Sequence, residues 1–290
     1  MKAGLHLPIL FIAALALTLL SGCTSAPDSG ITSSSASLTP AASPFKTPAY
    51  TATLPASPTP TVTALPTPSP TLRAQICSPL EGIGRAQLPD MIHNPFNPPR
   101  EGSDNPHQGV DFADLQGPDR IAVTGRPVTA VLGGRVALVT KDRFPYGNAI
   151  LIETPLDDLP AAWLDSLDLP QDLDPHANRS ALTCPEQTPQ PWDLSRQSLY
   201  LLYAHMLGAP DFQTGQAVIC GQVLGAIGSS GNALNPHLHL EIRLGPANAR
   251  FASMAHYDSS ATPQEMAAYC TWRVSGYFRL VDPLRLLSLP

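Results

Sequence analysis

Polar and apolar residues alternate strictly over His237–Arg243, and this alternation limits what the chain can fold into. Side chains of a β-strand point alternately to opposite faces, so His237 and His239 project to one side. The leucine and isoleucine residues between the polar ones then pack into a core on the other side. The segment is therefore predicted to be a strand with one buried face and two imidazoles on the opposite face.

Other short β-like runs, separated by glycine-containing turns, occur from Gln75 onward. They are Arg135–Val139, Ala149–Glu153, Leu199–His205 and Val223–Ile227. Two late helix starts are predicted. Thr262 is followed by a proline and a capping-box glutamate, Glu265, and Asp282–Pro283 begins a second short turn. The fold class is therefore mainly β, with short C-terminal helices.

A stretch rich in proline and aspartate, residues 155–198, interrupts the series of strands. It holds one helix-like piece, around Ala161–Leu167. Because surface loops tolerate extra length at a small entropic cost, we interpret residues 155–198 as an insertion into the sheet domain.

The N-terminus is typical of an export signal. Lys2 precedes an apolar run, Leu7–Leu20, that is short for a membrane span. The sequence Leu20–Cys23 resembles the bacterial lipobox, whose cysteine is lipidated and becomes the first residue of the mature protein. We therefore expect a signal peptide at residues 1–22 and a lipid anchor on Cys23, which several acyl chains would hold at a bilayer. An uncleaved signal anchor is the alternative.

Residues 23–74 consist almost entirely of Ser, Thr, Pro and Ala. Such a segment cannot bury enough apolar surface to offset its ordering entropy, so we expect a disordered tether. A proline-rich chain extends by about 3.1 Å per residue, which gives a reach on the order of 100 Å from the membrane. The predicted location is extracytoplasmic, on a membrane-anchored lipoprotein of the bacterial cell envelope.

Four cysteines follow the predicted tether: Cys77, Cys184, Cys220 and Cys270. An even number outside the cytoplasm favours two disulfides, and the sequence leaves all three pairings open. Zinc binding by these cysteines is disfavoured, because no Cys-x-x-Cys pair is present.

A second group of candidate ligands lies at His107–Asp111, where a histidine and an aspartate stand four residues apart in a turn. Catalytic zinc sites use three protein ligands and leave a fourth position for water. His107, Asp111 and one histidine of the later pair would complete such a set. In the run Leu199–His205, Tyr203 and His205 are expected to share a face, which brings a further proton carrier into the same sheet.

Three motifs, His107–Asp111, Tyr203–His205 and His237–His239, together resemble those of the lysostaphin-type (LytM-like) zinc metallopeptidases, in that family's order. Glycine-containing segments such as Gly133–Val136 and Gly228–Asn232 are similar to the family's turns. The resemblance implies a compact antiparallel β-sheet domain of the lysostaphin-like (duplicated hybrid motif) type over residues 75–290. This chain departs from the family in two ways that bear on substrate preference. The family often has a basic residue just before its first motif, where this chain has Asp104–Pro106, and the insertion is long.

Position by position, the resemblance implies His107, Asp111 and His239 as ligands of one Zn²⁺ and His205 and His237 as an unligated catalytic pair. His237 is expected to move protons. His205, if protonated or donating a hydrogen bond, would steady an oxyanion. The other histidines of this region, His93, His176 and His256, have no matching role and are expected on the surface or in loops.

The predicted function is zinc-dependent endopeptidase cleavage of peptide cross-links in peptidoglycan. The net charge of −6 gives no basic footprint, so nucleic acid is not expected as a partner. Two alternatives stay open. One is a non-catalytic wall-binding regulator of other hydrolases, and the other is a zinc peptidase that acts on extracellular proteins.

Overall fold

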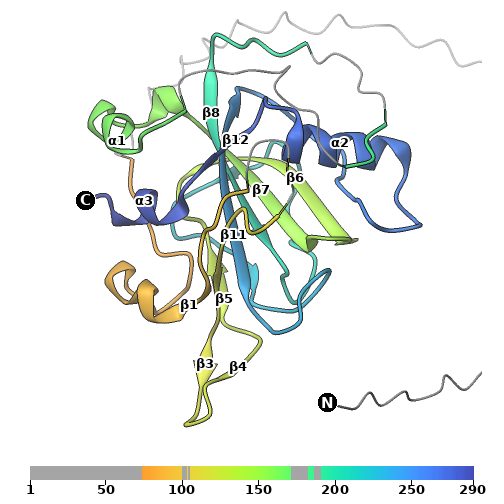
Figure 1. The fold of residues 1–290 in the computed structure, drawn as a ribbon. Coiled ribbons are helices and arrows are strands. Elements are labelled where there is room, and N and C mark those ends of the chain that lie inside the picture. The colour runs from red at the N-terminus through yellow and green to blue at the C-terminus, as the bar shows by residue number, and fades with distance from the viewer. Residues whose placement is uncertain (1–73, 100–102, 104, 171–181, 186–190) are drawn as a thin grey trace, which may run out of the picture. The chain divides into compact units, whose positions relative to one another are not determined.

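The computed structural model describes residues 74–290, except 100–102, 104, 171–181 and 186–190 (Figure 1). The predicted signal peptide (1–22), the predicted lipidation site Cys23, the predicted tether up to residue 73, and parts of the predicted insertion lie outside the described residues. Among the residues that the structure describes, no helix combines the length and the apolar character needed to cross a membrane.

The main sheet has eight strands, and every neighbouring pair in it is antiparallel. In spatial order its strands are β1 (Ile92–Asn94), β2 (Val110–Phe112), β11 (Leu238–Pro246), β8 (Gln197–Ala204), β7 (Gly147–Pro155), β6 (Gly134–Arg143) and β9 (Ala217–Val218), with β12 (Arg279–Val281) also paired to β11. Two small sheets pair β5 (Pro127–Thr129) with β10 (Val223–Ala226), and β3 (Leu115–Gln116) with β4 (Ile121–Ala122). The predicted antiparallel, mainly β fold class is confirmed.

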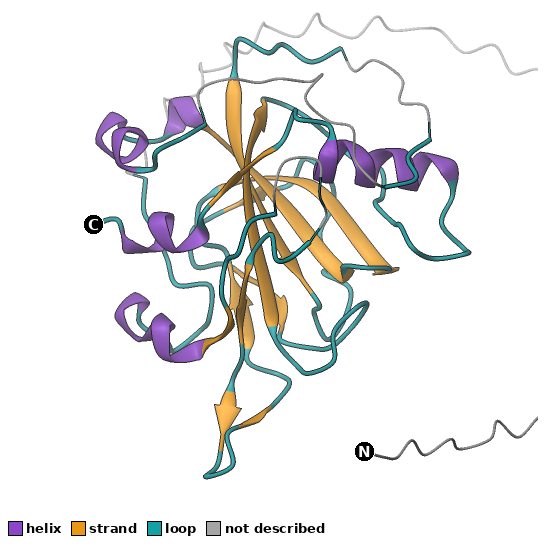
Figure 2. Cartoon of the chain, in the orientation of Figure 1, coloured by secondary structure: helices purple, strands orange, loops and turns teal. Residues whose placement is uncertain are grey.

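The helices are few and short, as Figure 2 shows. They are the 3₁₀ turns η1 (Arg85–Met91) and η2 (Leu156–Asp158) and the helices α1 (Ala161–Ser166), α2 (Pro263–Val274) and α3 (Pro283–Ser288). The start of α2 is the predicted capping box: Thr262 Oγ1 accepts from the Glu265 backbone N–H at 3.2 Å, and the Glu265 carboxylate accepts from the Thr262 N–H at 3.0 Å. The predicted start of α3 at Asp282–Pro283 is also confirmed.

The main sheet separates two hydrophobic clusters. Leu238, Leu240 and Ile242 of β11 belong to the first cluster, as the alternation predicts. On the other face, Trp272 of α2 packs in the second cluster. The polar residues of β11 point to this second face. They are buried, with exposures of 6% for His239, 0% for Glu241 and 2% for Arg243.

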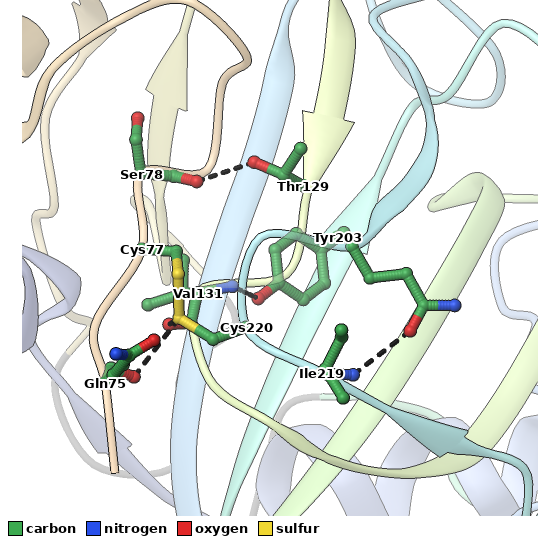
Figure 3. The surroundings of a disulfide bond; sticks show 9 residues. Gln75, Cys77, Ser78, Thr129, Val131, Tyr203, Ile219 and Cys220 are labelled. Carbon is green, nitrogen blue, oxygen red and sulfur yellow. Dashed lines mark hydrogen bonds between the residues drawn. A yellow bond between two sulfur atoms is a disulfide. The ribbon is translucent and has the colours of Figure 1, made fainter. Parts of the chain in front are cut away.

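Two disulfides form, and the structure gives the pairing that the sequence left open: Cys77 with Cys220, and Cys184 with Cys270. Figure 3 shows the first, which joins the segment before η1 to the turn between β9 and β10. Beside it, Tyr203 Oη accepts from the Val131 backbone N–H at 2.8 Å, so this buried phenol is satisfied (Figure 3). The second disulfide joins α2 to the segment that precedes β8.

Candidate metal centre

The three candidate ligands come together through the pairing of β2 with β11, which places Asp111 directly opposite His239. His107 lies just before β2 and bridges to Asn97. His239 Nδ1 is 2.8 Å from Asp111 Oδ1, His107 Nε2 is 3.1 Å from the same oxygen, and the two nitrogens are 3.2 Å apart. The structure thus groups these three residues, with ligand atoms that all lie within 4.8 Å of one another.

Gly109 permits this close approach. A Cβ at this position would lie 2.5 Å from the Leu240 carbonyl oxygen and 2.7 Å from His239 Cε1, which is shorter than real Cβ contacts allow. Any larger residue would push β2 away from the His239 ring. The glycine between the two ligand candidates of the first motif therefore has a steric role.

The chemistry of this group fits zinc. One carboxylate oxygen and two imidazole nitrogens converge, and these are donor types that Zn²⁺ takes in catalytic sites. The outer oxygen of Asp111, Oδ2, accepts a hydrogen bond from Asn94 Nδ2 at 3.2 Å. That contact leaves Oδ1 on the side of the two imidazoles.

His205 and His237 form an adjacent pair whose ring centroids lie 4.8 Å apart. His237 Nδ1 is 2.7 Å from the Asn235 carbonyl oxygen, and His205 Nδ1 is 2.8 Å from that of Ser230. A carbonyl oxygen only accepts, so each Nδ1 carries a proton, and each Nε2 of a neutral ring presents a lone pair. His237 Nε2 is 3.6 Å from Asp111 Oδ1, next to the candidate ligands.

The backbone at His205 departs from the predicted strand. Alternation would direct His205 to the same face as Tyr203, whose side chain packs in the first cluster. Instead β8 ends at Ala204, and His205 takes a left-handed φ of 63°. Its ring lies 5.8 Å from that of His239. The prediction that Tyr203 and His205 share a face is therefore wrong, because the positive φ turns His205 toward the candidate ligands.

Burial and neighbouring charges shift the pKa values of these histidines in opposite directions. Burial lowers the pKa of His205 to about 3, and burial is also the main cause that lowers the pKa of His237. Burial lowers the pKa of His239 too, but Asp111 and Glu241 outweigh it and raise that pKa to about 9. Metal binding through His239 would therefore release a proton.

The carboxyl groups next to His239 remain ionised. Burial raises the pKa of Asp111, but its hydrogen bonds to His107 and His239 have the larger opposite effect. The pKa of Asp111 therefore lies well below its ordinary range. Burial likewise raises the pKa of Glu241, but Arg243, Arg273 and His239 together outweigh this, so the net shift is again downward. Each carboxylate is thus available as an acceptor at neutral pH.

A cavity of about 670 Å³ opens above these residues. All five predicted site residues line it, together with Tyr146, Tyr257, Tyr269 and Arg273, which the sequence did not identify. Tyr269 and Arg273 come from α2, and no local motif indicates that this helix lies beside the cavity. Glu241 had a signal: strand alternation places it on the face of His237 and His239.

The remaining histidines differ from one another. His93, expected on the surface or in a loop, is exposed but lies on β1 and lines the cavity. His256 lies in a loop and is buried, with Nε2 3.0 Å from the Thr183 carbonyl oxygen. His176 lies outside the described residues. Of the two described histidines in this group, His93 lines the cavity and His256 is not among its lining residues.

Comparison with solved structures finds similar chains at low identity. The catalytic domain of lysostaphin from Staphylococcus simulans is 16% identical, covers 71% of this chain and 98% of its own length, and has a TM-score of 0.35. The prophage-encoded M23 protein EnpA from Enterococcus faecalis, as a catalytic-domain mutant, is 20% identical over 55% of this chain and 85% of its own, with a TM-score of 0.31. A zinc-containing peptidase from Vibrio cholerae is 23% identical over 52% and 32%, with a TM-score of 0.30.

A comparison with family models gives a direct match. Residues 194–250 match the model of Peptidase family M23. This range includes β8 and β11 and therefore two of the three motifs, with His205, His237 and His239. His107 and Asp111 lie before it. The resemblance to the lysostaphin-type peptidases is confirmed: the segment that carries the second and third motifs matches Peptidase family M23.

Proposed function

We propose that this chain is a zinc-dependent endopeptidase that hydrolyses peptide cross-links of peptidoglycan in the cell envelope. The family match supports a peptidase. The observation that carries the proposal is the grouping of His107, Asp111 and His239 on one wall of a cavity that His205 and His237 also line. We place the peptidase domain at residues 75–290, with residues 155–198 as its insertion.

His107 Nε2, Asp111 Oδ1 and His239 Nδ1 would hold the zinc ion. When bound, zinc supplies a Lewis acid that polarises a carbonyl oxygen and lowers the pKa of water to about 7. The chain must then provide a group that accepts a proton from the attacking water and returns it to the leaving amine. A neutral imidazole beside the ligands suits both steps.

We assign this proton transfer to His237. Its Nδ1–H is engaged by the Asn235 carbonyl, which fixes the tautomer and directs the Nε2 lone pair toward the site. The lowered pKa of His237 keeps the ring neutral, and therefore able to accept, at pH 7. Because its Nε2 is 3.6 Å from Asp111 Oδ1, a water beside the candidate ligands is within its reach.

For His205 we propose a role that differs from the oxyanion contact expected from the resemblance. Its Nδ1–H is engaged by the Ser230 carbonyl, and its pKa of about 3 leaves Nε2 without a proton at neutral pH. A neutral ring in this tautomer accepts hydrogen bonds from the cavity and cannot donate one. We propose that His205 is a catalytic residue that orients the attacking water by accepting a hydrogen bond.

Peptidoglycan as the substrate is supported by the predicted envelope location. A lipid anchor on Cys23 and a tether over residues 23–74 would hold the peptidase domain at a distance from the membrane, where a cross-linked wall polymer lies. Both features lie outside the described residues. The rival functions are a wall-binding regulator without hydrolysis and a peptidase of extracellular proteins.

The proposal predicts that the purified, zinc-loaded chain releases new amino groups from purified peptidoglycan and that a zinc chelator stops the release. Glycan cleavage would instead produce new reducing ends, so both products are measured in the same digests. Unfolded casein serves as a protein substrate for comparison. Rapid release from casein and none from peptidoglycan would favour the extracellular-protein alternative, and no release from either substrate would favour the regulator.

A further inference from the structure

The carboxylate of Glu241 lies at the centre of a buried polar network behind the candidate ligands. Oε1 accepts from Arg243 Nε at 2.5 Å, and Oε2 accepts from Tyr146 Oη at 3.0 Å and from Arg273 Nη1 at 3.2 Å. Oε2 also lies 3.4 Å from His239 Nε2. The carboxylate is fully buried and held from several sides, so its position is well defined.

The His239 ring lies between two carboxylates. Its Nδ1 faces Asp111 and His107, and its Nε2 faces Glu241. A carboxylate only accepts hydrogen bonds, so the contact with Glu241 favours a proton on Nε2 and a lone pair on Nδ1. That is the tautomer in which Nδ1 can bind a metal. Metal-ligating histidines commonly donate their other ring N–H to such a partner.

The residues that hold Glu241 come largely from the C-terminal part of the chain. Arg243 Nη1 donates to the Phe278 carbonyl oxygen at 2.9 Å, and its guanidinium lies 5.0 Å from the centre of the Trp272 ring. Arg273 and Trp272 belong to α2, which the Cys184–Cys270 disulfide attaches to the segment before β8. Phe278, Trp272 and Arg273 lie beyond residues 194–250, the range that matches the family model, whereas Arg243 and Glu241 lie within it.

The same network reaches the first motif. Arg243 Nη2 donates to the side-chain oxygen of Gln108, the residue next to His107. Arg243 therefore contacts both the residue that faces the His239 ring and the residue beside the other candidate histidine ligand. Movement of the Arg243 side chain would disturb both sides of the metal centre.

We propose that Glu241 is a positioning residue, held by Arg243, Arg273 and Tyr146, that orients His239 with Nδ1 toward the metal. The α2 segment then has a defined role in metal binding without supplying a ligand. The inference rests on the proposed zinc function. Charged groups buried for packing alone cost stability, and an apolar side chain of similar volume would serve that purpose better.

The test compares zinc affinity in Glu241→Ala and Glu241→Gln chains by competition with a chromophoric chelator. Loss of an outer-shell partner typically weakens metal affinity by about 10–100-fold, and we expect a loss in this range for Glu241→Ala. Glu241→Gln should lose less, because an amide oxygen can still accept from His239 Nε2–H. If the alanine variant does not fold, the isosteric glutamine variant decides.

Glu153 provides the matched control. It is also a buried carboxylate of the main sheet, 2% exposed, that pairs with an arginine (Arg250, 2.5 Å) and accepts from Ser198 Oγ at 2.9 Å. It has no contact with a candidate ligand. Glu153→Gln and Glu153→Ala should lower the unfolding temperature and leave zinc affinity unchanged.

The visible absorption of bound Co²⁺ gives a second readout, which a general loss of stability would not change. With Co²⁺ in place of zinc, the Glu241 variants should show altered visible bands, and the Glu153 variants should match the wild type. Equal zinc affinity in all variants, or equal weakening in both series, would overturn the proposal. A wild type that binds zinc but cleaves no peptide contradicts only the proposed function, because the affinity ratios remain measurable; a wild type that binds no zinc contradicts both.

Discussion

Replacing His237 with alanine is expected to lower peptide hydrolysis by about 10²–10⁴-fold, the usual contribution of a positioned general base. The zinc content should stay at one ion per chain, because His237 Nδ1 is engaged by the Asn235 carbonyl and the ring is not one of the three grouped ligand candidates. Hydrolysis rate and bound zinc are measured on the same preparation. A chain that loses zinc in proportion to activity would show that His237 is a ligand.

His93 is the control for this substitution. It also lines the cavity, but it lies on β1 and is not among the histidines that pair with Asp111, which are His107, His237 and His239. His93→Ala also removes an imidazole from the cavity, so the two variants lose the same kind of side chain from the same cavity. We expect a much smaller decrease in hydrolysis for His93→Ala than for His237→Ala. Equal decreases would contradict the assignment of proton transfer to His237.

Asp111→Asn should abolish stoichiometric zinc binding, and hydrolysis with it. The substitution keeps the shape of the side chain and removes the charge that interacts with His107, His237 and His239. Because Asp111 would supply a ligand atom directly, the expected loss of zinc affinity exceeds the about 10–100-fold effect of an outer-shell partner. Chelator competition measures the affinity, and peptide hydrolysis follows the same titration.

Asp114→Asn is the matched control for Asp111→Asn. Asp114 is equally buried, at 6% exposure, and lies three residues farther along the chain. Its carboxylate pairs with Arg126 Nε at 3.0 Å and contacts none of the candidate ligands. The control should lower stability and retain zinc. Zinc binding that survives in the Asp111→Asn chain would refute the proposed ligand set.

Local sequence patterns predicted the face alternation of β11 and the starts of α2 and α3. The alternation over His237–Arg243 predicts which residues of β11 face the first cluster, and the capping box at Thr262 predicts the start of α2. Both signals act within a few residues of chain. The antiparallel, mainly β fold class follows from such runs and turns, although β11 begins at Leu238, one residue after the predicted start.

Features that depend on long-range contacts could not be read from the sequence. The pairing of Asp111 with His239 joins two strands far apart in the chain, and the Cys77–Cys220 disulfide joins two distant segments outside the strands. The orientation of His205 depends on one positive φ that breaks the strand alternation. Local patterns also do not show that Arg273 reaches Glu241, because that contact requires α2 to pack on the sheet.

The central claim is that one zinc ion in this cavity is required for peptide hydrolysis. The most direct measurement is a zinc titration of the metal-stripped chain, with bound zinc and release of amino groups from peptidoglycan followed at every step. The account predicts that activity rises in proportion to bound zinc and reaches its plateau at one zinc per chain. Full activity in the stripped chain, or one bound zinc with no release of amino groups, would contradict it.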